Sequence, residues 1–192
     1  CCTCSMVFAI CAPFAVSAMD NDPRKWINRM HIAVDSINYQ GTLVRMRQGT
    51  LQVEGKPEAE TFHIYHRSVD GQSSERLVGM DGEAFEVIRN SAETICVFPA
   101  QRSVVIEKRS SNPKSPLAAG LPAYSKEMEG NYRFDIIADD RVAGRAVKVL
   151  EIASSDRYRY GYKIWLDTRT AMPLKSQLRS ADGKALLEEV MF

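Results

Sequence analysis

Few side chains in this sequence could carry out chemistry, and their spacing argues against a catalytic or metal site. The chain has 192 residues and three histidines, His31, His63 and His66. His63 and His66 are three apart in a segment of strand-like alternation, so they project to opposite faces and cannot chelate one metal ion. The acidic pairs Asp139-Asp140 and Glu188-Glu189 also diverge when extended, which predicts solvated surface charge. We therefore expect no enzyme, no metal and no cofactor.

The overall charge argues against binding of nucleic acid. Lysine plus arginine is 25 and aspartate plus glutamate is 24, which leaves a net charge of +1. The tract 157–163 interleaves basic and aromatic residues, as some nucleic-acid binders do. A period of two, however, places its three tyrosines on one face and Arg159 and Lys163 on the other. This pattern predicts a half-buried strand and no binding of nucleic acid.

The N-terminal segment is typical of an export signal. Residues 1–19 contain no charged side chain, and the apolar run 6–12 is followed by Pro13 and the small-residue tract 15–18. This pattern predicts a signal peptide over residues 1–18, cleaved after Ala18. Its start is expected to be truncated, because the chain begins with Cys1 rather than methionine. An uncleaved N-terminal membrane anchor remains the alternative, since about 20 apolar residues span a bilayer.

The cysteines do not form a disulfide pattern. Four of the five lie in the predicted signal peptide, and only Cys96 remains. A lipidated Cys11 is disfavoured, because Ile10 is too bulky for the preceding position. Cys96 lies in the alternating apolar run 95–98, which predicts a small buried core residue.

One helix opens the predicted domain at residues 19–192. Asp22 is a suitable N-cap and Pro23 suits the first helical position. Apolar residues then recur at spacings of three and four to Ile37, which gives the helix one apolar face. The helix is expected to end near Asn38.

The rest of the chain alternates with the period of β-strands. The expected strands are 42–47, 61–67, 75–80, 84–88, 94–98, 103–108, 133–137, 146–153, 158–167, 173–179 and 186–192. Asp70-Gly71, Asp81-Gly82 and Asp182-Gly183 indicate hairpin turns. The proline-rich segment 110–123 interrupts the strands, with one short helix expected near 117–121. This order predicts an α+β fold, mostly β: a large, curved antiparallel sheet that wraps around the helix as an unclosed half-barrel.

Large apolar side chains on this sheet and helix form a candidate site for an apolar ligand. Methionine in particular suits a surface that repacks around varied ligands. The alternative is that the same residues form an ordinary filled core, because periodicity cannot distinguish a core from a cavity. The predicted ligand-binding residues are Met30, Ile37, Val44, Met46, Phe62, Ile64, Leu77, Met80, Phe85, Phe98, Tyr160, Tyr162 and Ile164.

Two sequence blocks resemble the RseB/MucB family of sigma-E regulatory proteins. The first is SERLVGMDG at 74–82 with EVIR at 86–89, similar to the family's "ERL-x-x-LDG … EV-x-R" hairpin. The second is DRYRYGYKIWLD at 156–167 with PLKS at 173–176, similar to "DRYRYGY-x-x-WLD … LP-x-K". The resemblance extends from Trp26 to Phe192. Phe85 departs from it, since family members often carry a basic residue there.

The resemblance implies a periplasmic negative regulator of envelope stress signalling. Such a protein binds the periplasmic region of an RseA/MucA-type anti-sigma factor and protects it from proteolysis, and binding of lipopolysaccharide or acyl chains releases the partner. It also implies that 19–192 is a LolA/LolB-like N-terminal domain, with the family's smaller C-terminal domain missing. A lipoprotein or lipid carrier of the LolA/LolB type is the alternative. The sequence leaves open whether the chain pairs as a homodimer.

Overall fold

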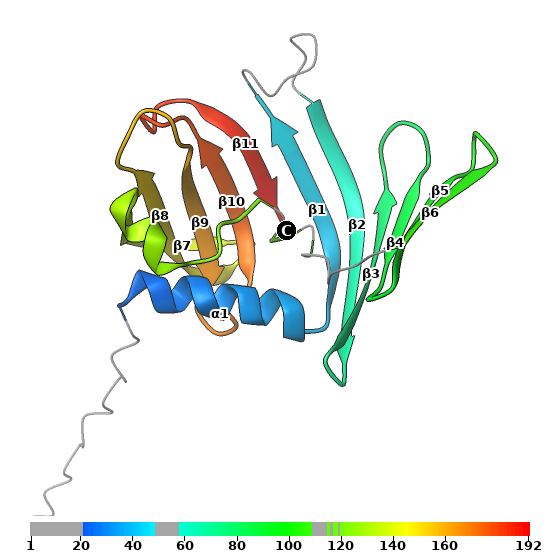
Figure 1. The fold of residues 1–192 in the computed structure, drawn as a ribbon, viewed down its shortest axis with the longest axis horizontal. Coiled ribbons are helices and arrows are strands. Elements are labelled where there is room, and N and C mark those ends of the chain that lie inside the picture. Colours follow the sequence, from blue (N-terminus) through cyan, green and yellow to red (C-terminus); the bar gives the residue numbers. More distant parts are fainter. Residues whose placement is uncertain (1–20, 49–57, 109–114, 116, 119) are drawn as a thin grey trace, which may run out of the picture.

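The computed structural model describes residues 21–48, 58–108, 115, 117–118 and 120–192. The predicted signal peptide lies outside these residues, as do parts of the proline-rich segment. Within these residues, one α-helix and one 3₁₀ helix accompany eleven strands (Figure 1). The elements are α1 (Pro23–Ser36), β1 (Tyr39–Arg47), β2 (Glu58–Val69), β3 (Gln72–Gly79), β4 (Glu86–Arg89), β5 (Glu93–Phe98), β6 (Ser103–Lys108), η2 (Lys126–Gly130), β7 (Tyr132–Val142), β8 (Arg145–Ser154), β9 (Gly161–Asp167), β10 (Pro173–Arg179) and β11 (Leu186–Met191).

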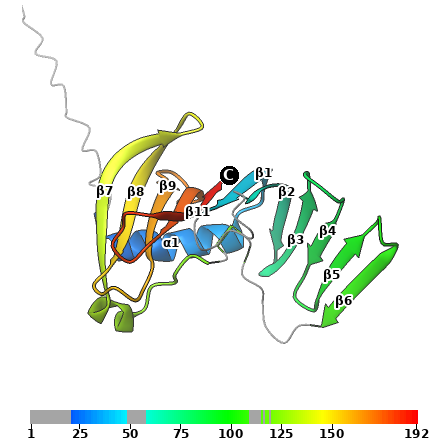
Figure 2. The same ribbon diagram turned by 90° about the horizontal axis from the view of Figure 1, so that it is seen from above.

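All eleven strands form one antiparallel sheet in the order β6-β5-β4-β3-β2-β1-β11-β10-β9-β8-β7. Strands that follow one another in the sequence are neighbours, except where β1 pairs with β11 and joins the two halves. The sheet curls but does not close, because β6 and β7 form its two edges (Figure 2). The predicted fold class is therefore confirmed.

Helix α1 lies across one face of this sheet, which we call the inner face (Figure 1). Asp22 caps the helix, since its carboxylate accepts a hydrogen bond from the Arg24 amide, and Pro23 occupies the first turn. The helix ends at Ser36, slightly earlier than predicted, because Ile37 is extended. Its buried side chains are Pro23, Trp26, Ile27, Met30, Ala33 and Val34.

The core has two clusters, and α1 contributes side chains to both. Ala33 and Val34 belong to a cluster with Leu43, Phe62 and Ile64, from β1 and β2. Trp26, Ile27 and Met30 belong to a second cluster, with Leu150, Ile152, Ile164 and Leu166 of β8 and β9. The helix therefore ties the two halves of the sheet together from the inner side.

Tight turns set the register of two hairpins. Asp70 and Gly71 have φ angles of 51° and 75°, the left-handed pair that a two-residue type I′ turn between β2 and β3 requires. Ala143 and Gly144, at 47° and 78°, make the same kind of turn between β7 and β8, which we did not predict. Gly82 and Gly183 also have positive φ but lie in longer connections.

Two sequence expectations about local structure are wrong. The described residues of segment 117–121 form turns rather than a short helix, although Leu117, Ala118 and Leu121 are buried in the core. Helical structure occurs instead in η2. The strand expected from residue 158 begins only at Gly161, because Asp156 organises the preceding residues into a turn.

The N-cap of α1 gives a test of how the helix is held. Replacing Asp22 with alanine is expected to lower the free energy of unfolding by about 1 kcal/mol, because the Arg24 amide loses its acceptor. Denaturant titration followed by circular dichroism measures this change. Asn28→Ala, on the exposed side of the same helix, is the matched control and should change stability by less than about 0.5 kcal/mol. Equal effects of the two variants would contradict the capping role.

Candidate binding surface

The thirteen residues predicted to bind an apolar ligand do not line one open recess. Five of them are buried: Met30, Phe62, Ile64, Leu77 and Ile164. Six others are partly buried, and these are Ile37, Val44, Met46, Phe85, Phe98 and Tyr162. Met80 and Tyr160 are exposed, at 52% and 46%. The structure brings most of the set together, but as packing partners of α1 and of one another.

Strand register explains which members of the set meet. Leu43 pairs with Phe62, so the inner face of β1 carries Leu43 and every second residue from it. Phe62, Ile64, Leu77, Phe85 and Ile37 join the first core cluster. Met30, Tyr162 and Ile164 join the second cluster.

Val44 and Met46 lie on the opposite face from Leu43. Each face of β1 carries apolar residues. The face that lies toward α1 also carries Arg45 and Arg47. Sequence alternation alone would place the arginines outward. The pattern therefore missed a charged group on the inner face.

That group is a cluster of two arginines and two glutamates from three neighbouring strands. Arg47 lies 3.3 Å from Glu188 and 3.5 Å from Glu60, and Arg45 lies 3.7 Å from Glu60 and 4.0 Å from Glu188. All four side chains are 21–30% exposed. Within the part of the chain that the structure describes, Arg45 Nε and Glu60 Oε2 are buried without a hydrogen-bond partner. Buried polar atoms normally have partners, so these two atoms are an unsatisfied feature of the charged cluster.

A second polar group lies where β1, β2 and β3 meet the segment that contains Ser115. The Tyr39 hydroxyl lies 2.7 Å from Ser115 Oγ, which donates to Glu75 Oε1 at 2.7 Å. Arg89 Nη1 lies 3.5 Å from Glu75 Oε2. Glu75 is only 7% exposed, and burial raises the pKa of its carboxyl despite the Ser115 hydrogen bond and the Arg89 charge. This network fixes the buried Ser115 and Leu117 against the sheet.

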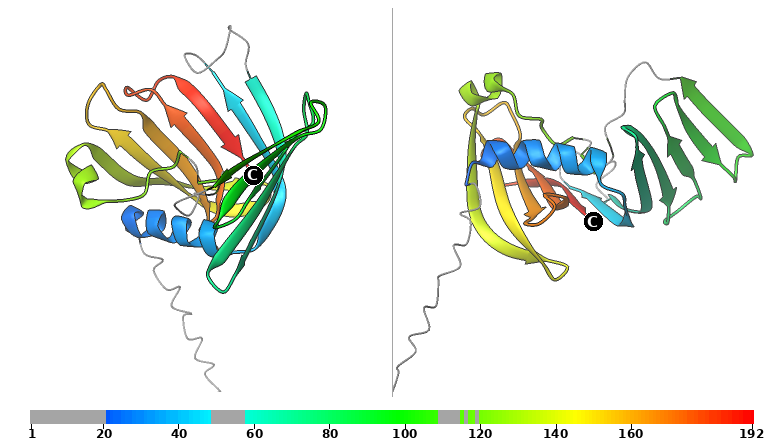
Figure 3. Two further views of the ribbon diagram at one scale, coloured as in Figure 1. Left: turned by 45° about the vertical axis from the view of Figure 1, so that its right-hand side comes forward. Right: turned by 90° about the horizontal axis from the view of Figure 1, so that it is seen from below.

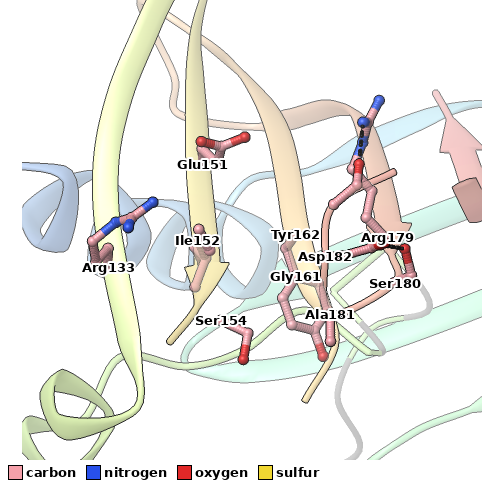
Figure 4. A pocket seen from close by; sticks show the side chains of 12 residues that line it. Arg133, Glu151, Ile152, Ser154, Gly161, Tyr162, Arg179, Ser180, Ala181 and Asp182 are labelled. Atoms are coloured by element: carbon pink, nitrogen blue, oxygen red, sulfur yellow. Dashed lines mark hydrogen bonds between the residues drawn. The ribbon is translucent and has the colours of Figure 1, made fainter. Parts of the chain in front are cut away.

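The face opposite α1 carries a polar pocket of about 230 Å³ (Figure 4). Arg133, Glu151 and Arg179 project from β7, β8 and β10, and residues 180–183 form one wall. Arg179 donates to the Gln177 side-chain oxygen and to the Gly183 carbonyl. The pocket holds mixed charge, and in its wall the Ser180 hydroxyl donates to Asp182 Oδ1 at 2.6 Å.

The loop between β8 and β9 projects the residues that were expected to form a half-buried strand. The Asp156 carboxylate accepts hydrogen bonds from the amides of Tyr158 and Arg159, at 2.8 and 3.2 Å. Tyr158 is consequently 76% exposed, and the Arg157 guanidinium stacks over its ring at 5.1 Å. Exposed tyrosine and arginine side chains are the residue types that dominate protein interfaces.

Two further expectations need correction. Cys96 is partly exposed rather than buried in the core. Glu189 is not a solvated surface charge, because it is 8% exposed and lies 2.9 Å from Lys175 Nζ.

Neither a metal site nor a membrane span is found over the described ranges. There, no group of three or more His, Cys, Asp or Glu side chains could hold a metal ion. The one α-helix of the same ranges, α1, is too short and too polar to cross a bilayer.

Comparison with protein-family models shows which family the chain belongs to. Residues 22–192 match the family model described as the MucB/RseB N-terminal domain. The chain belongs to this family. The family is one of regulatory proteins and not of enzymes, which confirms the expectation from the missing catalytic residues.

This MucB/RseB N-terminal domain is similar to curated relatives of known name. It is 31% identical over 172 residues to the sigma factor AlgU regulatory protein MucB of Pseudomonas aeruginosa, covering 89% of this chain and 49% of that protein. It is 24% identical to the sigma-E factor regulatory protein RseB of Escherichia coli K12, covering 83% of this chain and 47% of that protein. The chain thus spans about half the length of the curated relatives it matches.

Solved structures are similar to this chain as well. A crystal structure described as MucB in complex with MucA(peri) matches with a TM-score of 0.66 and 32% identity, over 89% of this chain and 54% of that one. An uncharacterised conserved protein from Thermus thermophilus has a TM-score of 0.51 at 10% identity, over 88% of this chain and 82% of that one, which shows a shared fold alone.

The buried Glu75 gives a prediction about pH. Its pKa is raised in the folded chain, so its contribution to stability is full below the pKa of the unfolded chain and is lost as the pH rises through the folded value. Glu75→Gln keeps an acceptor for Ser115 but cannot ionise. The variant should therefore be more stable than the wild type at neutral pH, and the difference should vanish below about pH 4. Denaturant midpoints across pH measure this difference.

Glu86→Gln is the matched control on the neighbouring strand. The hydrogen bond from Arg76 lowers the pKa of Glu86, so this carboxylate stabilises the fold above its unfolded pKa and loses that effect as the pH falls. The control variant should differ from the wild type in the opposite direction. If both variants shifted stability alike, the burial argument for Glu75 would fail.

Proposed function

We propose that the chain is the N-terminal domain of a periplasmic negative regulator of sigma-E type envelope stress signalling. In this proposal it binds the periplasmic region of an RseA/MucA-type anti-sigma factor and shields it from proteolysis. The main support is the match to MucB in complex with MucA(peri), at 32% identity over 89% of this chain. The names of the curated relatives describe regulators of AlgU and sigma-E factors.

Features of this chain are consistent with a polypeptide partner. The charged cluster of Arg45, Arg47, Glu60 and Glu188 offers both signs of charge on the inner face. The loop at Asp156 presents Tyr158 and its neighbouring arginines without cover from the described residues. Both features suit recognition of a polar chain better than uptake of a purely apolar ligand.

Release of the partner by lipid or lipopolysaccharide is the finer part of the proposal. Over β1, β2, β8 and β9, the apolar part of the inner face is occupied by α1 and by Leu117, Ala118 and Leu121. An acyl chain that binds over these strands therefore has to displace the apolar side of α1. Exposing its four large buried side chains, Trp26, Ile27, Met30 and Val34, costs roughly 6–12 kcal/mol. Burial of about ten methylenes, at ~0.8 kcal/mol each, offsets a cost of that size.

Filling of the inner face also bears on the alternative of a lipid carrier. A carrier needs an apolar recess that accepts and releases cargo without unfolding its own core. Because α1 and the segment around Leu117 occupy that position, no observation favours the carrier over the regulator.

Binding of the partner can be tested directly. The purified chain and the periplasmic segment of the anti-sigma factor of the same organism should form a complex measurable by calorimetry. Tyr158→Ala should weaken that complex by about 2 kcal/mol, or roughly thirtyfold, if this loop is an interface hot spot. Tyr65→Ala, which removes an exposed tyrosine from β2, is the matched control and should leave affinity unchanged.

Protection is measured separately, as the rate at which the site-1 protease cleaves the segment with and without the chain. Protection is expected to follow occupancy, so Tyr158→Ala should restore cleavage at concentrations where the wild type prevents it. Unchanged cleavage at saturating wild-type chain, tested also with the longer natural protein, would refute the shielding role.

Lipid entry beneath α1 can be followed by fluorescence, because the chain has two tryptophans. Trp26 is 1% exposed under the helix, so Trp165→Phe leaves one reporter at the position where an acyl chain must enter. Saturation with lipid A is expected to change the emission and quenching of Trp26. The control Trp26→Phe leaves only Trp165, whose emission should change little. A bound lipid with unaltered Trp26 emission would show that it binds elsewhere.

A further inference from the structure

One row of residues across β7 to β10 lacks large side chains at its centre. Arg133 of β7 pairs with Ala153 of β8, and Arg179 of β10 pairs with Gly161 of β9. Helix α1 (blue) lies across the inner face of these strands (yellow to orange) in Figure 3. Ala153 points to the opposite face, because its neighbour Ile152 belongs to the second core cluster. On that face, two arginines therefore flank a floor of alanine and glycine.

This small floor forms the bottom of the pocket of about 230 Å³ (Figure 4). A Cβ atom at position 161 would lie 3.3 Å from the Ile152 carbonyl oxygen and 4.0 Å from Ala153 Cα, so glycine permits the close approach of the two strands. Sites for drug-sized ligands usually measure roughly 300–1,000 Å³. The occupant of this pocket is therefore a smaller molecule or group.

One wall of the pocket is held by side-chain hydrogen bonds. Ser180 donates to Asp182 at the turn, as described above. Arg179 donates to Gln177 Oε1 from both Nε and Nη2, and to the Gly183 carbonyl from Nη1. A guanidinium group has five N–H donors, so these three bonds fix the Arg179 side chain and leave two N–H groups for a ligand.

The other wall carries one charge of each sign, and the two charges do not contact each other. Arg133 and Glu151 are diagonal neighbours on β7 and β8, about 7–8 Å apart. Within the described ranges, neither forms a salt bridge or a side-chain hydrogen bond. Lys163 is opposite Glu151 on β9, but its ammonium lies over the Trp165 ring, 5.1 Å from the centroid. The half-buried Glu151 carboxylate is thus available to a cation from outside.

We propose that this pocket binds a small zwitterion, with an ammonium group and a carboxylate or phosphate group a few bonds apart. The Glu151 carboxylate accepts hydrogen bonds from the ammonium, while Arg133 and the two remaining N–H groups of Arg179 donate to the anionic group. Such charge-assisted hydrogen bonds are roughly twice as strong as neutral ones. A ligand with charge of one sign leaves the opposite charge of the pocket unpaired, so the pocket discriminates against it. The site does not depend on the proposed regulatory function.

Titration of the full chain with L-alanine and with phosphoethanolamine, followed by amide NMR, tests the proposal. Both probes are small zwitterions, and they differ in the anionic group. Saturable shifts are expected at Ala153, Gly161 and residues 180–183 with at least one of them, and the tighter probe identifies the anionic group that the pocket accepts. Acetate and ethylammonium each carry a single charge and should bind about tenfold more weakly or worse.

Variants of the lining test which groups bind. Glu151→Gln and Arg133→Gln should each weaken zwitterion binding by about tenfold, because each removes one charged partner. Ala153→Leu fills the floor and should abolish binding. Asp135→Asn is the matched control: it removes an exposed carboxylate opposite Glu151 that does not line the pocket, and it should leave affinity unchanged.

Circular dichroism and the unfolding midpoint check that each variant is folded. The two glutamine variants change surface side chains, so they keep the test valid if Ala153→Leu does not fold. Absence of saturable shifts with both zwitterions would overturn the proposal. Equal affinity for acetate and for L-alanine, or binding that neither glutamine variant weakens, would overturn it as well.

Discussion

Packing of one amphipathic helix against a sheet too wide to be flat is the interaction on which the rest of this structure depends. The two halves of the sheet share hydrogen bonds only where β1 meets β11. Helix α1 contacts both halves, with Ala33 and Val34 on one and Trp26, Ile27 and Met30 on the other. Burial of this apolar side therefore stabilises the core and holds the two halves of the sheet together.

That packing limits what the inner face can bind. The curved sheet encloses α1, and over β1, β2, β8 and β9 the helix and the segment around Leu117 fill the apolar space on the inner face. What remains of the inner face at the far end of β1 is charged. Ligands of different chemistry therefore bind different parts of this face. A polar polypeptide can contact the charged cluster directly, whereas an acyl chain that binds beneath α1 has to displace part of the core. This difference gives the proposed coupling between partner and lipid a physical basis, since a displaced helix changes the surface on which the partner binds.

Among the described residues, buried and half-buried charges are compensated by groups from neighbouring strands. Arg45 and Arg47 are tolerated beside the core because Glu60 and Glu188 lie on the adjacent strands. Glu75 is tolerated because Ser115 and Arg89 contact its two oxygens, although burial still raises its pKa. Such compensation joins residues more than a hundred positions apart, as with Arg47 and Glu188, and is a product of sheet order.

Local features of this protein could be predicted from its sequence. Asp22, Pro23 and the three-to-four spacing specify α1, because capping and amphipathicity act within a few residues. Asp70-Gly71 specifies a tight hairpin, and the alternation of eleven segments specifies a mostly β fold. The two motif blocks were sufficient to indicate the family. Both sets of alternate residues in β1 include apolar side chains, so the sequence did not indicate which set faces inward.

Three features followed from the fold and not from local sequence: which side chains of β1 face inward, the burial of Glu189, and the packing of the apolar residues as a core rather than a cavity. Each depends on partners from distant strands: Glu60 and Glu188 draw the arginine phase inward, and α1 occupies the space that periodicity alone left open. The exposure of Tyr158 likewise follows from hydrogen bonds to Asp156, which compete with strand formation. Local preference is a property of a few neighbouring residues, whereas burial depends on what the rest of the chain places on top.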